Sequence, residues 1–415
     1  MVSSIKKSKK VLLIDAFSTL HVGNGALIDN TYKLCKKYIG DDVEILSIDA
    51  KTNEGRFPVV MEDVLTGYGG SSLNKLRYAI SLFVFFLAET LNCYMFKGRL
   101  RLPWTKRFKN FQEAVKRAQI CVSLSGETIN DHYMPHMYLR LLTYHLAILR
   151  GRKFLVFPQS IGPVFRPFSK WLLRKVLGKA DFIIARDNES FALAKDLWSG
   201  CKVEILFCPD VAVTQESVPE RLPVRLQSKK VVGITVSDIP KKEMGFDGDY
   251  LNEFLNGVGD GLDSKEYQIL LMPSNYSNID VSRDYHVCLK AKSLLEEMNF
   301  DVSILDNDVY HPDIFQGMQK NLYAFISTRM HVGILATSAG VPTLMINTQH
   351  KIRSYMMLMG MEDFVVELDS MGDIPKRLRM LLDDNESIRA RLIANNVVLR
   401  GKVESTMLKL ARSLD

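Results

Sequence analysis

The chain has 415 residues, and 54 Lys and Arg against 47 Asp and Glu give a formal net charge of +7. Hydrophobic residues make up 47% and charged residues 24%, which is typical of a folded globular protein and excludes a disordered, collagen-like or coiled-coil chain. The length predicts two or three domains. Because the charge excess is mild and the basic residues are interleaved with acidic ones, the composition argues against a dedicated nucleic-acid binder.

The N-terminal sequence and the cysteines indicate a cytoplasmic protein. The first residues are basic, but the apolar run that follows ends at Asp15 after four residues, so we expect a first strand and not a signal peptide. None of the six cysteines belongs to a CxxC or CxxH pair, and we predict buried free thiols in a reducing compartment, with no zinc site or redox motif.

The apolar segment Tyr78–Phe96 allows two interpretations. It is nearly long enough to span a bilayer, but Glu89 and Asn92 would then lie inside the apolar zone, at a cost of about 2.5 kcal/mol or more for the acid. One interpretation is a helix buried in the protein or packed in a groove. The other is a helix that dips into a membrane surface.

Strand and helix patterns alternate along the whole chain, which is typical of α/β layers with parallel sheets. The first half predicts strands at Val11–Ile14, Glu44–Ile48, Ile120–Leu124, Phe154–Phe157, Phe182–Ala185 and Val203–Phe207. The second half predicts strands at Val231–Val236, Gln268–Met272, Val302–Leu305, Ala324–Ser327 and Thr343–Ile346, and a short one at Phe364–Val366. The polar segment 214–230 is the candidate linker, so we expect one domain over 1–220 and another over 221–415, the latter ending in one or two long helices from Ile374 to Leu414.

Residues 325–344 form the most informative motif. A predicted strand ends at Thr328, a helix begins with Arg329-Met330-His331, and Gly340 ends that helix ahead of Pro342. The N-terminus of a helix already favours an anion, to which Arg adds a planar fork for carboxylate or phosphate and His adds a titratable proton. The alternative is that the Arg pairs with an acid and the His packs against a neighbouring strand.

Three more predicted strands end in polar residues. Gln159-Ser160-Ile161-Gly162-Pro163 follows the strand at 154–157, Arg186-Asp187 follows the strand at 182–185, and Pro209-Asp210 follows the strand at 203–207. Asp187 or Asn188 is the expected N-cap of the next helix. Neither GxGxxG nor GxxxxGK[ST] occurs, so a standard dinucleotide or P-loop site is not supported.

In their order, these motifs resemble the polysaccharide pyruvyl transferase family. The resemblance comprises the QSIGP stretch, ARD followed by Ser190, the Pro209-Asp210 pair, R-x-H at Arg329 and His331 ahead of Gly340 and Pro342, and Lys351 downstream. The segment 21–28, with Asn24 and Gly25, is similar to the family's N-terminal loop. Two positions depart from the family pattern: Ser125-Gly126-Glu127 replaces a run of glycines, and Ser274 stands where many members have a His after Pro273.

The resemblance implies two Rossmann-like domains that face one another across a cleft, as in GT-B glycosyltransferases, with the acceptor side in the first domain and the donor side in the second. The reaction would transfer the enolpyruvyl group of phosphoenolpyruvate to two hydroxyls of one sugar, which gives a cyclic ketal and phosphate. The acceptor would be a cell-surface polysaccharide or its lipid-linked precursor. We expect phosphoenolpyruvate as a co-substrate, no other cofactor and no metal.

Arg329 and Arg186 are the candidate forks for the donor anion, and His331 is the candidate acid that protonates the donor's methylene carbon. Glu127 and Asp187 are the candidate bases for the sugar hydroxyl, with Asp210 a weaker one; for each acid, helix capping or turn formation is the alternative. Lys351 holds phosphate or is solvated. The remaining predicted substrate-binding residues are Gln159, Ser160, Gly162, Asn24, Asp210 and Met330.

Two other functions stay open at this point. A GT-B nucleotide-sugar glycosyltransferase would usually carry a Glu in the helix after Arg329, where this chain has Thr337 and Ser338 instead. A non-catalytic relative that binds sugar or a partner would have no need of the polar strand ends. A peripheral contact with the inner face of the cytoplasmic membrane would fit the apolar segment at 78–96 and a lipid-linked acceptor.

Overall fold

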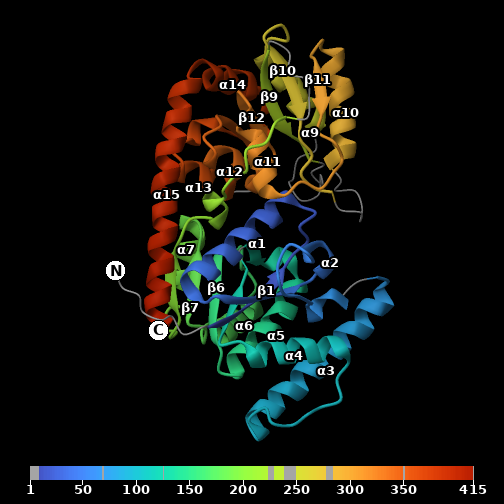
Figure 1. Cartoon of the computed structure of the whole chain (residues 1–415), viewed down its shortest axis with the longest axis vertical. Coiled ribbons are helices and arrows are strands. Elements are labelled where there is room, and N and C mark those ends of the chain that lie inside the picture. Colours follow the sequence, from blue (N-terminus) through green and yellow to red (C-terminus); the bar gives the residue numbers. More distant parts are fainter. Residues whose placement is uncertain are drawn as a thin grey trace. The chain divides into compact units, whose positions relative to one another are not determined.

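The computed structural model describes residues 9–67, 70–124, 126–222, 229–237, 249–276, 284–348 and 351–414 (Figure 1). The chain divides into two compact units. Unit 1 comprises Met1–Ser18, Leu27–Val211 and Lys402–Asp415, and unit 2 comprises Thr19–Ala26 and Ala212–Gly401. The units therefore differ from two domains divided once at residue 220. Residues 19–26 belong to the unit that contains the second half of the chain, and residues 402–415 belong to the unit that contains the first half.

Unit 1 contains a parallel sheet of eight strands in the order β3-β2-β1-β4-β6-β7-β8, with β5 paired to β6. Its strands are β1 (Lys10–Ala16), β2 (Asp42–Ser47), β3 (Val60–Glu62), β4 (Ile120–Ser123), β5 (Gly126–Ile129), β6 (Lys153–Ile161), β7 (Phe182–Ala185) and β8 (Glu204–Phe207). The central strands β1, β4, β6 and β7 are buried along almost their whole length, because helices cover both faces of such a sheet.

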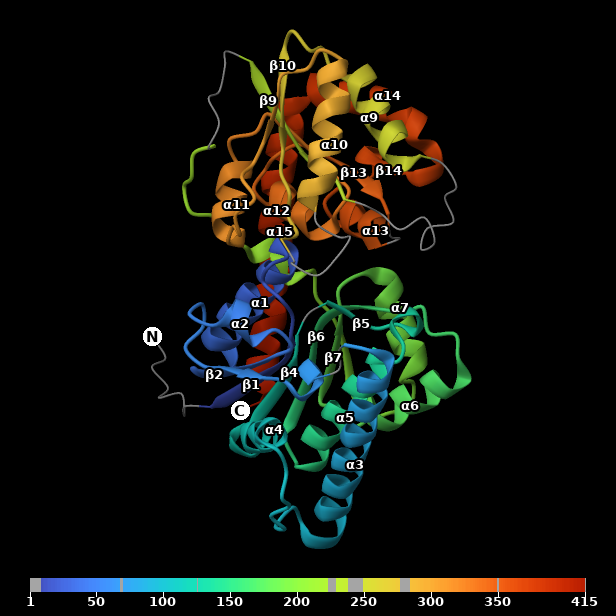
Figure 2. The ribbon, with the colours of Figure 1, turned by 90° about the vertical axis from the view of Figure 1, so that its right-hand side faces the viewer.

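The helices of unit 1 form the layers around this sheet (Figure 2). They are α2 (Ala50–Asn53), α3 (Ser72–Phe96), α4 (Lys106–Arg117), α5 (His136–Leu149), α6 (Pro167–Leu177) and α7 (Asn188–Leu197), with short turns η1 (Cys35–Ile39), η2 (Val64–Gly67) and η3 (Asp131–Tyr133). Buried side chains of α3 to α7 form one apolar core with those of β1, β4 and β6. Helix α1 (Val22–Leu34) begins in unit 2 and ends in unit 1.

Unit 2 contains a parallel sheet of six strands in the order β11-β10-β9-β12-β13-β14. The strands are β9 (Lys230–Thr235), β10 (Tyr267–Leu271), β11 (Val302–Ile304), β12 (Ala324–Ser327), β13 (Thr343–Asn347) and β14 (Val365–Glu367). Numbered along the chain, this is the strand order 3-2-1-4-5-6 of the Rossmann fold, in which ligands bind at the carboxyl ends of the strands where the order reverses. In unit 2 that point lies between β9 and β12.

The helices of unit 2 connect these strands. They are α9 (Tyr250–Gly261), α10 (Asp284–Glu297), α11 (Pro312–Gln319), α12 (Met330–Ser338), α13 (Lys351–Leu358) and α14 (Ile374–Asp383), with short turns η4 (Val211–Thr214), η5 (Glu362–Phe364) and η6 (Leu368–Asp373). Helix α15 (Asn385–Leu414) belongs to unit 2 as far as Gly401 and to unit 1 beyond it.

The predicted α/β class with two Rossmann-like domains is confirmed, and a strand covers each of the twelve segments predicted as strands. The sequence analysis did not predict β3 and β5, which are short and weakly apolar. It treated residues 21–28 as a loop, whereas a helix begins at Val22. Two helices fill the C-terminal segment, as expected. Part of the predicted linker, residues 223–228, lies outside the described residues.

Candidate functional site

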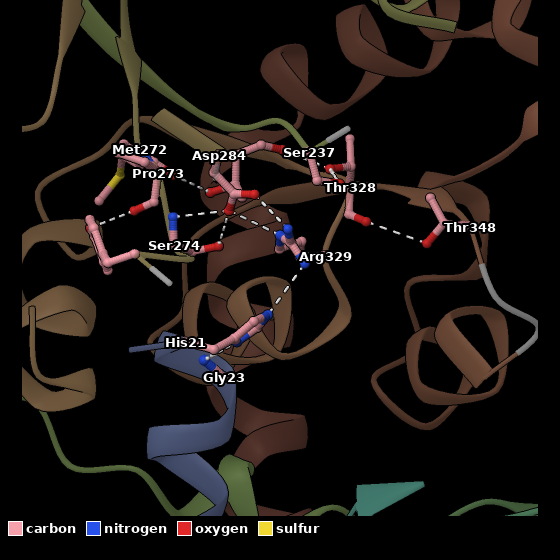
Figure 3. A network of polar contacts seen from close by, with 12 residues as sticks. His21, Gly23, Ser237, Met272, Pro273, Ser274, Asp284, Thr328, Arg329 and Thr348 are labelled. Carbon is pink, nitrogen blue, oxygen red and sulfur yellow. Dashed lines mark hydrogen bonds and ion pairs between the residues drawn. The ribbon is translucent and has the colours of Figure 1, made fainter. Parts of the chain in front are cut away.

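The main candidate site is a polar cluster in unit 2, which we call the Arg329 cluster and define as His21, Ser274, Asp284, Arg329 and His331. Figure 3 shows the first four of these residues. Arg329 follows β12 and is the N-cap residue of α12. Ser274 follows β10, and Asp284 is the first residue of α10. These elements bring the side chains to the carboxyl ends of the strands, beside the reversal of strand order.

Asp284 holds Arg329 in a fixed orientation. The Asp284 side chain is fully buried, and it accepts hydrogen bonds from Arg329 Nε at 3.0 Å and from Nη2 at 2.5 Å. Such a two-point contact between guanidinium and carboxylate restricts rotation as well as adding energy. The sequence analysis gave two roles for Arg329, a fork for the donor anion or a partner of an acid; the pairing with an acid is present, and it occupies two of the three guanidinium nitrogens.

Ser274 completes the environment of Asp284. Its backbone N–H and its hydroxyl both donate to Asp284 Oδ2, at 3.1 and 2.9 Å. A buried carboxylate is stable only when its oxygens receive hydrogen bonds, so four donors satisfy Asp284 here. The residue at which the sequence departs from the family pattern thus supports Arg329 through Asp284.

The third guanidinium nitrogen of Arg329, Nη1, lies beside the imidazole of His21. His21 Nδ1 accepts a hydrogen bond from the Gly23 N–H at 3.1 Å, which assigns the proton of a neutral imidazole to Nε2. Nε2 lies 3.3 Å from Arg329 Nη1. Because a guanidinium can only donate, these two N–H groups do not bond to each other. An anionic oxygen that lies to one side of both nitrogens, at hydrogen-bond distance from each, would accept from both.

The environment keeps His21 neutral. Burial lowers the pKa of His21 well below its ordinary value, and the positive charges of Arg329 and His331 lower it further. A neutral imidazole with Nε2 protonated is a hydrogen-bond donor without a positive charge. The sequence analysis quoted His21 only as the start of the N-terminal loop, and its chemical role was missed because its neighbours come from residues more than 300 positions away.

Gly23 lies close to the side chains of both His331 and His21. A Cβ atom added at Gly23 would lie 2.7 Å from His331 Cβ and 3.2 Å from His21 Cε1, so only glycine allows the two histidines to approach in this way. His331 is in the first turn of α12, whose N-cap residue makes no side-chain capping bond. The N–H groups and dipole of such a helix end favour an anion.

The other predicted residues of unit 2 surround this cluster or lie elsewhere in the unit. Met330 is buried in the first turn of α12, Asn24 is half-buried in the first turn of α1, and Lys351 is buried as the first residue of α13. Their predicted contacts with substrate stay predictions.

A second polar group lies in unit 1, which we call the Arg186 cluster and define as Ser160, Arg186, Asp187 and Asp210. Arg186 is buried after β7, where it forms an ion pair with Asp210 through Nη1 at 2.7 Å and donates to Ser160 Oγ from Nε at 2.9 Å. Ser160 Oγ in turn donates to Asp187 at 3.1 Å. The strand ends that the sequence motifs predicted as polar are therefore joined by a continuous network.

Asp187 caps helix α7, as predicted. Its Oδ1 accepts from the Ser190 N–H at 2.7 Å, and its Oδ2 accepts from the Ser190 hydroxyl at 2.8 Å. The alternative role of capping is thus present for this acid, and its predicted role as a base stays a prediction.

Three other predicted residues of unit 1 lie on or directly after β5 and β6: Gln159, Gly162 and Glu127. Gln159 is fully buried and bonds to Thr128 at 2.6 Å and to Ser123 at 3.1 Å, so it connects the carboxyl ends of β4, β5 and β6. Gly162 has φ +96°, and a Cβ there would lie 2.6 Å from Leu193 Cδ2. Glu127, on β5, is half-buried and accepts from Asn130 at 3.1 Å.

The sequence analysis missed two buried acids, Asp15 and Asp63. Asp15, the second-last residue of β1, has φ +69°, a left-handed conformation that is uncommon for a non-glycine residue and often marks a functional position. It accepts hydrogen bonds from Tyr144 and Ser123. Burial, and secondarily the charge of Asp15, raise the pKa of Asp63 to about 7. A motif search could not find these acids, because nothing in their local sequence indicates burial.

The three predicted groups on which the donor site depends fall in both units: Arg329 and His331 in unit 2, and Arg186 in unit 1. The structure brings Arg329 and His331 together with His21, and it brings Arg186 together with Asp187 and Asp210. The convergence of all three groups on one anion stays a prediction. Among the described residues, no group of three or more His, Cys, Asp or Glu could hold a metal ion.

Comparisons with known proteins support both the fold and the family. Residues 21–350 match the model of the polysaccharide pyruvyl transferase family. The amylovoran biosynthesis protein AmsJ of Erwinia amylovora is 20% identical over 324 residues, which are 72% of this chain and 75% of AmsJ. Anabaena HepE, solved with UDP and glucose, matches 98% of this chain and 99% of its own with TM-score 0.56 and 11% identity. The trehalose-6-phosphate synthase OtsA gives TM-score 0.57 at 10% identity, over 98% and 99% of the two chains.

The fold is thus that of the GT-B glycosyltransferases, with two parallel sheets and polar residues at the carboxyl ends of their strands. Within this class, the chain belongs to the polysaccharide pyruvyl transferase family.

The raised pKa of Asp63 predicts a pH-dependent stability. The folded chain holds this proton more tightly than the unfolded chain. Protonated Asp63 therefore adds stability that is fully present below pH 3.8, the ordinary pKa of an Asp, and is lost as the pH rises through about 7. In Asp63→Asn, which mimics the neutral acid, this loss should be absent. Between these pH values, the free energy of unfolding of the wild type should fall relative to the variant by about 1.4 kcal/mol per pH unit. Denaturant titrations across this range measure it, with exposed Asp308→Asn as control; parallel profiles for wild type and Asp63→Asn would contradict the assignment.

The Arg329–Asp284 pair predicts a strong coupling in a double-mutant cycle. Arg329→Ala and Asp284→Ala should each destabilise the chain, because each leaves the partner without its counter-charge. The double variant should be more stable than the sum of the single effects implies, by about 1–3 kcal/mol. Urea unfolding at neutral pH measures this coupling energy. Additive effects would show that the pair contributes nothing specific.

Proposed function

We propose that the chain is a phosphoenolpyruvate-dependent pyruvyl transferase that forms a pyruvate ketal on a sugar of a cell-surface polysaccharide or of its lipid-linked precursor. Membership of the family and the likeness to an amylovoran biosynthesis protein support this role. The observation that carries the proposal is the pair of N–H groups, Arg329 Nη1 and His21 Nε2, that lie 3.3 Å apart near the N-terminus of α12.

The donor's charges suit this cluster. Phosphoenolpyruvate carries a carboxylate and a phosphate, and an anionic oxygen placed beside both Arg329 Nη1 and His21 Nε2 would accept a hydrogen bond from each. Since Asp284 offsets the charge of Arg329, orientation of N–H groups contributes more here than net positive charge. The N–H groups of the first turn of α12 would bind the second anionic group.

His331 is the acid in the proposed reaction. It gives a proton to the methylene carbon of the donor, which becomes a methyl group, while the neighbouring carbon gains oxocarbenium character. One sugar hydroxyl attacks that carbon and loses its proton to a base. The C–O bond to phosphate then breaks, the phosphate leaves, and the second hydroxyl adds to the same carbon and loses its proton. The products are a cyclic ketal and inorganic phosphate.

We assign Arg186 a positioning role in place of the donor-binding role expected from the sequence. Its guanidinium is buried and already paired with Asp210, so it orients Ser160 and Asp210 at the strand ends of unit 1. Glu127 is our candidate for the base, because it is half-exposed whereas the Asp187 carboxylate is engaged in capping α7. We also propose a cytoplasmic location, since all six cysteines are free thiols.

Donor binding provides the first test. Phosphoenolpyruvate should raise the melting temperature of the wild type, and UDP-glucose should not. Arg329→Ala and His21→Ala should each abolish this shift, because each removes one of the two N–H donors. Arg391→Ala, which changes an exposed arginine of α15, should retain it. A shift with UDP-glucose and none with phosphoenolpyruvate would favour a glycosyltransferase and overturn the proposal.

Catalysis by His331 provides the second test. His331→Asn should lower kcat for phosphate release about 10²–10⁴-fold with little change in KM, because it removes the proton donor and leaves the anion contacts. Phosphate release from phosphoenolpyruvate across a panel of sugar acceptors, with mass spectrometry of the product, measures the effect. His286→Asn, an exposed histidine of α10, is the matched control. An unchanged kcat in His331→Asn would exclude His331 as the acid.

A further inference from the structure

Helix α3 exposes many large apolar residues, while two of its polar residues face the protein. Glu89 and Asn92 are buried: Trp104 Nε1 donates to Glu89 at 2.7 Å, Arg150 forms an ion pair with it at 2.5 Å, and Asn92 bonds to the backbone of Leu100 at 3.0 and 3.1 Å. Ten large hydrophobic residues of the helix are 45–69% exposed: Leu73, Leu76, Ile80, Phe83, Val84, Leu87, Leu91, Tyr94, Met95 and Phe96.

The exposed residues form one continuous stripe. Most recur at intervals of three or four, which brings them to the same face of a helix. The opposite face, with Leu82, Phe85 and Phe86, packs into the core that contains α4 and α5 (Figure 2). We call the exposed face the α3 stripe. The expectation of a buried helix is therefore wrong for this face.

The helix is long and apolar enough to cross a membrane by length and composition. Spanning the bilayer would, however, separate Glu89 and Asn92 from their partners in the protein, at a high cost for the buried acid. A helix with one face held by the protein and the other apolar is suited instead to lie in the plane of a membrane surface.

The charge around α3 indicates which surface it would contact. Residues 64–112 contain eight basic residues and one acid, the buried Glu89. The basic residues are Lys75, Arg77, Lys97, Arg99, Arg101, Lys106, Arg107 and Lys109. This excess of seven equals that of the whole chain, so the even interleaving of charges expected from the composition does not hold here. A cationic rim around an apolar stripe complements an anionic lipid surface.

A basic pocket lies at the C-terminal end of the stripe. It has a volume of about 440 Å³ and is lined by Lys97, Lys116, Arg150 and Arg152, among others. The Arg150 side chain is only 6% exposed, and the Nε atoms of Arg150 and Arg152 are buried without a hydrogen-bond partner. Two of the lining residues are already paired with acids, Arg150 with Glu89 and Lys116 with Glu113. Donors of this kind suit the phosphate of a lipid headgroup.

We propose that the α3 stripe docks on the surface of an anionic phospholipid bilayer, with the basic pocket binding a headgroup phosphate. The stripe supplies apolar burial in the acyl boundary, and the pocket and rim supply preference for negative charge. This inference does not depend on the identity of the donor or on the activity of the Arg329 cluster.

Vesicle flotation with the full chain tests the proposal. The wild type should bind vesicles that contain phosphatidylglycerol at low salt and should bind phosphatidylcholine vesicles weakly. Leu87→Ser with Leu91→Ser should abolish binding. Lys97→Gln with Arg152→Gln should weaken binding to anionic vesicles about fivefold per charge. Val397→Ser with Val398→Ser, which changes two exposed apolar residues of α15, should bind like the wild type.

Hydrogen exchange and light scattering distinguish membrane docking from the alternatives. Hydrogen exchange of the unmodified chain should slow in residues 72–96 when anionic vesicles are added, which requires no variant to fold. Inorganic phosphate should not reproduce this protection if the ligand is a lipid surface. Absence of vesicle binding by the wild type at low salt would overturn the proposal. A dimer in light scattering that Leu87→Ser with Leu91→Ser converts to a monomer, with vesicle binding unchanged, would assign the stripe to a second copy of the chain.

Discussion

The ion pair between Arg329 and Asp284 is the interaction on which the candidate site depends. A fully buried carboxylate at the start of α10 would be unstable by itself, and it is satisfied by two nitrogens of Arg329 and two donors of Ser274. Because these groups come from the ends of β10 and β12 and from α10, one contact fixes the relative positions of three elements. It also leaves a single Arg329 nitrogen directed toward His21. The orientation of the proposed anion site is thus a consequence of how a buried charge is compensated.

Both units put polar residues at the carboxyl ends of parallel strands, yet the two groups differ in chemistry. In unit 2 the groups that remain available are N–H donors, which suits an anion. In unit 1 the charges are paired internally, as in Arg186 with Asp210, or held as buried acids, as in Asp15 and Asp63. Two features of unit 1 are energetically unfavourable: the left-handed backbone of Asp15 and the burial of the Asp63 carboxyl, which raises its pKa. The same topology therefore carries two different polar environments.

One face of helix α3 packs on the protein, and the other face exposes large apolar residues. Two of its polar side chains, Glu89 and Asn92, attach the helix to the protein, because they are bonded on the buried face. Leu82, Phe85 and Phe86 pack into the core, and the other large apolar side chains are exposed. The helix is thus apolar on both faces, whereas an ordinary amphipathic helix of a globular protein buries its one apolar face. A sequence window cannot distinguish the two arrangements, because both contain the same residues at the same spacing.

The sequence by itself determined the α/β class, all strands of the two sheets except β3 and β5, and the motifs at Gln159, Arg186, Asp210 and Arg329, because apolar periodicity and turn residues are local signals. It also identified the family, since the order of the motifs is specific. Only the tertiary structure decided which groups meet. Asp284 neutralises Arg329 from 45 residues away, and His21 reaches it from 308 residues away. Asp63 becomes a proton-binding group only through burial. Side-chain chemistry is written in the sequence, but burial and pairing depend on contacts between distant segments, which no local pattern records.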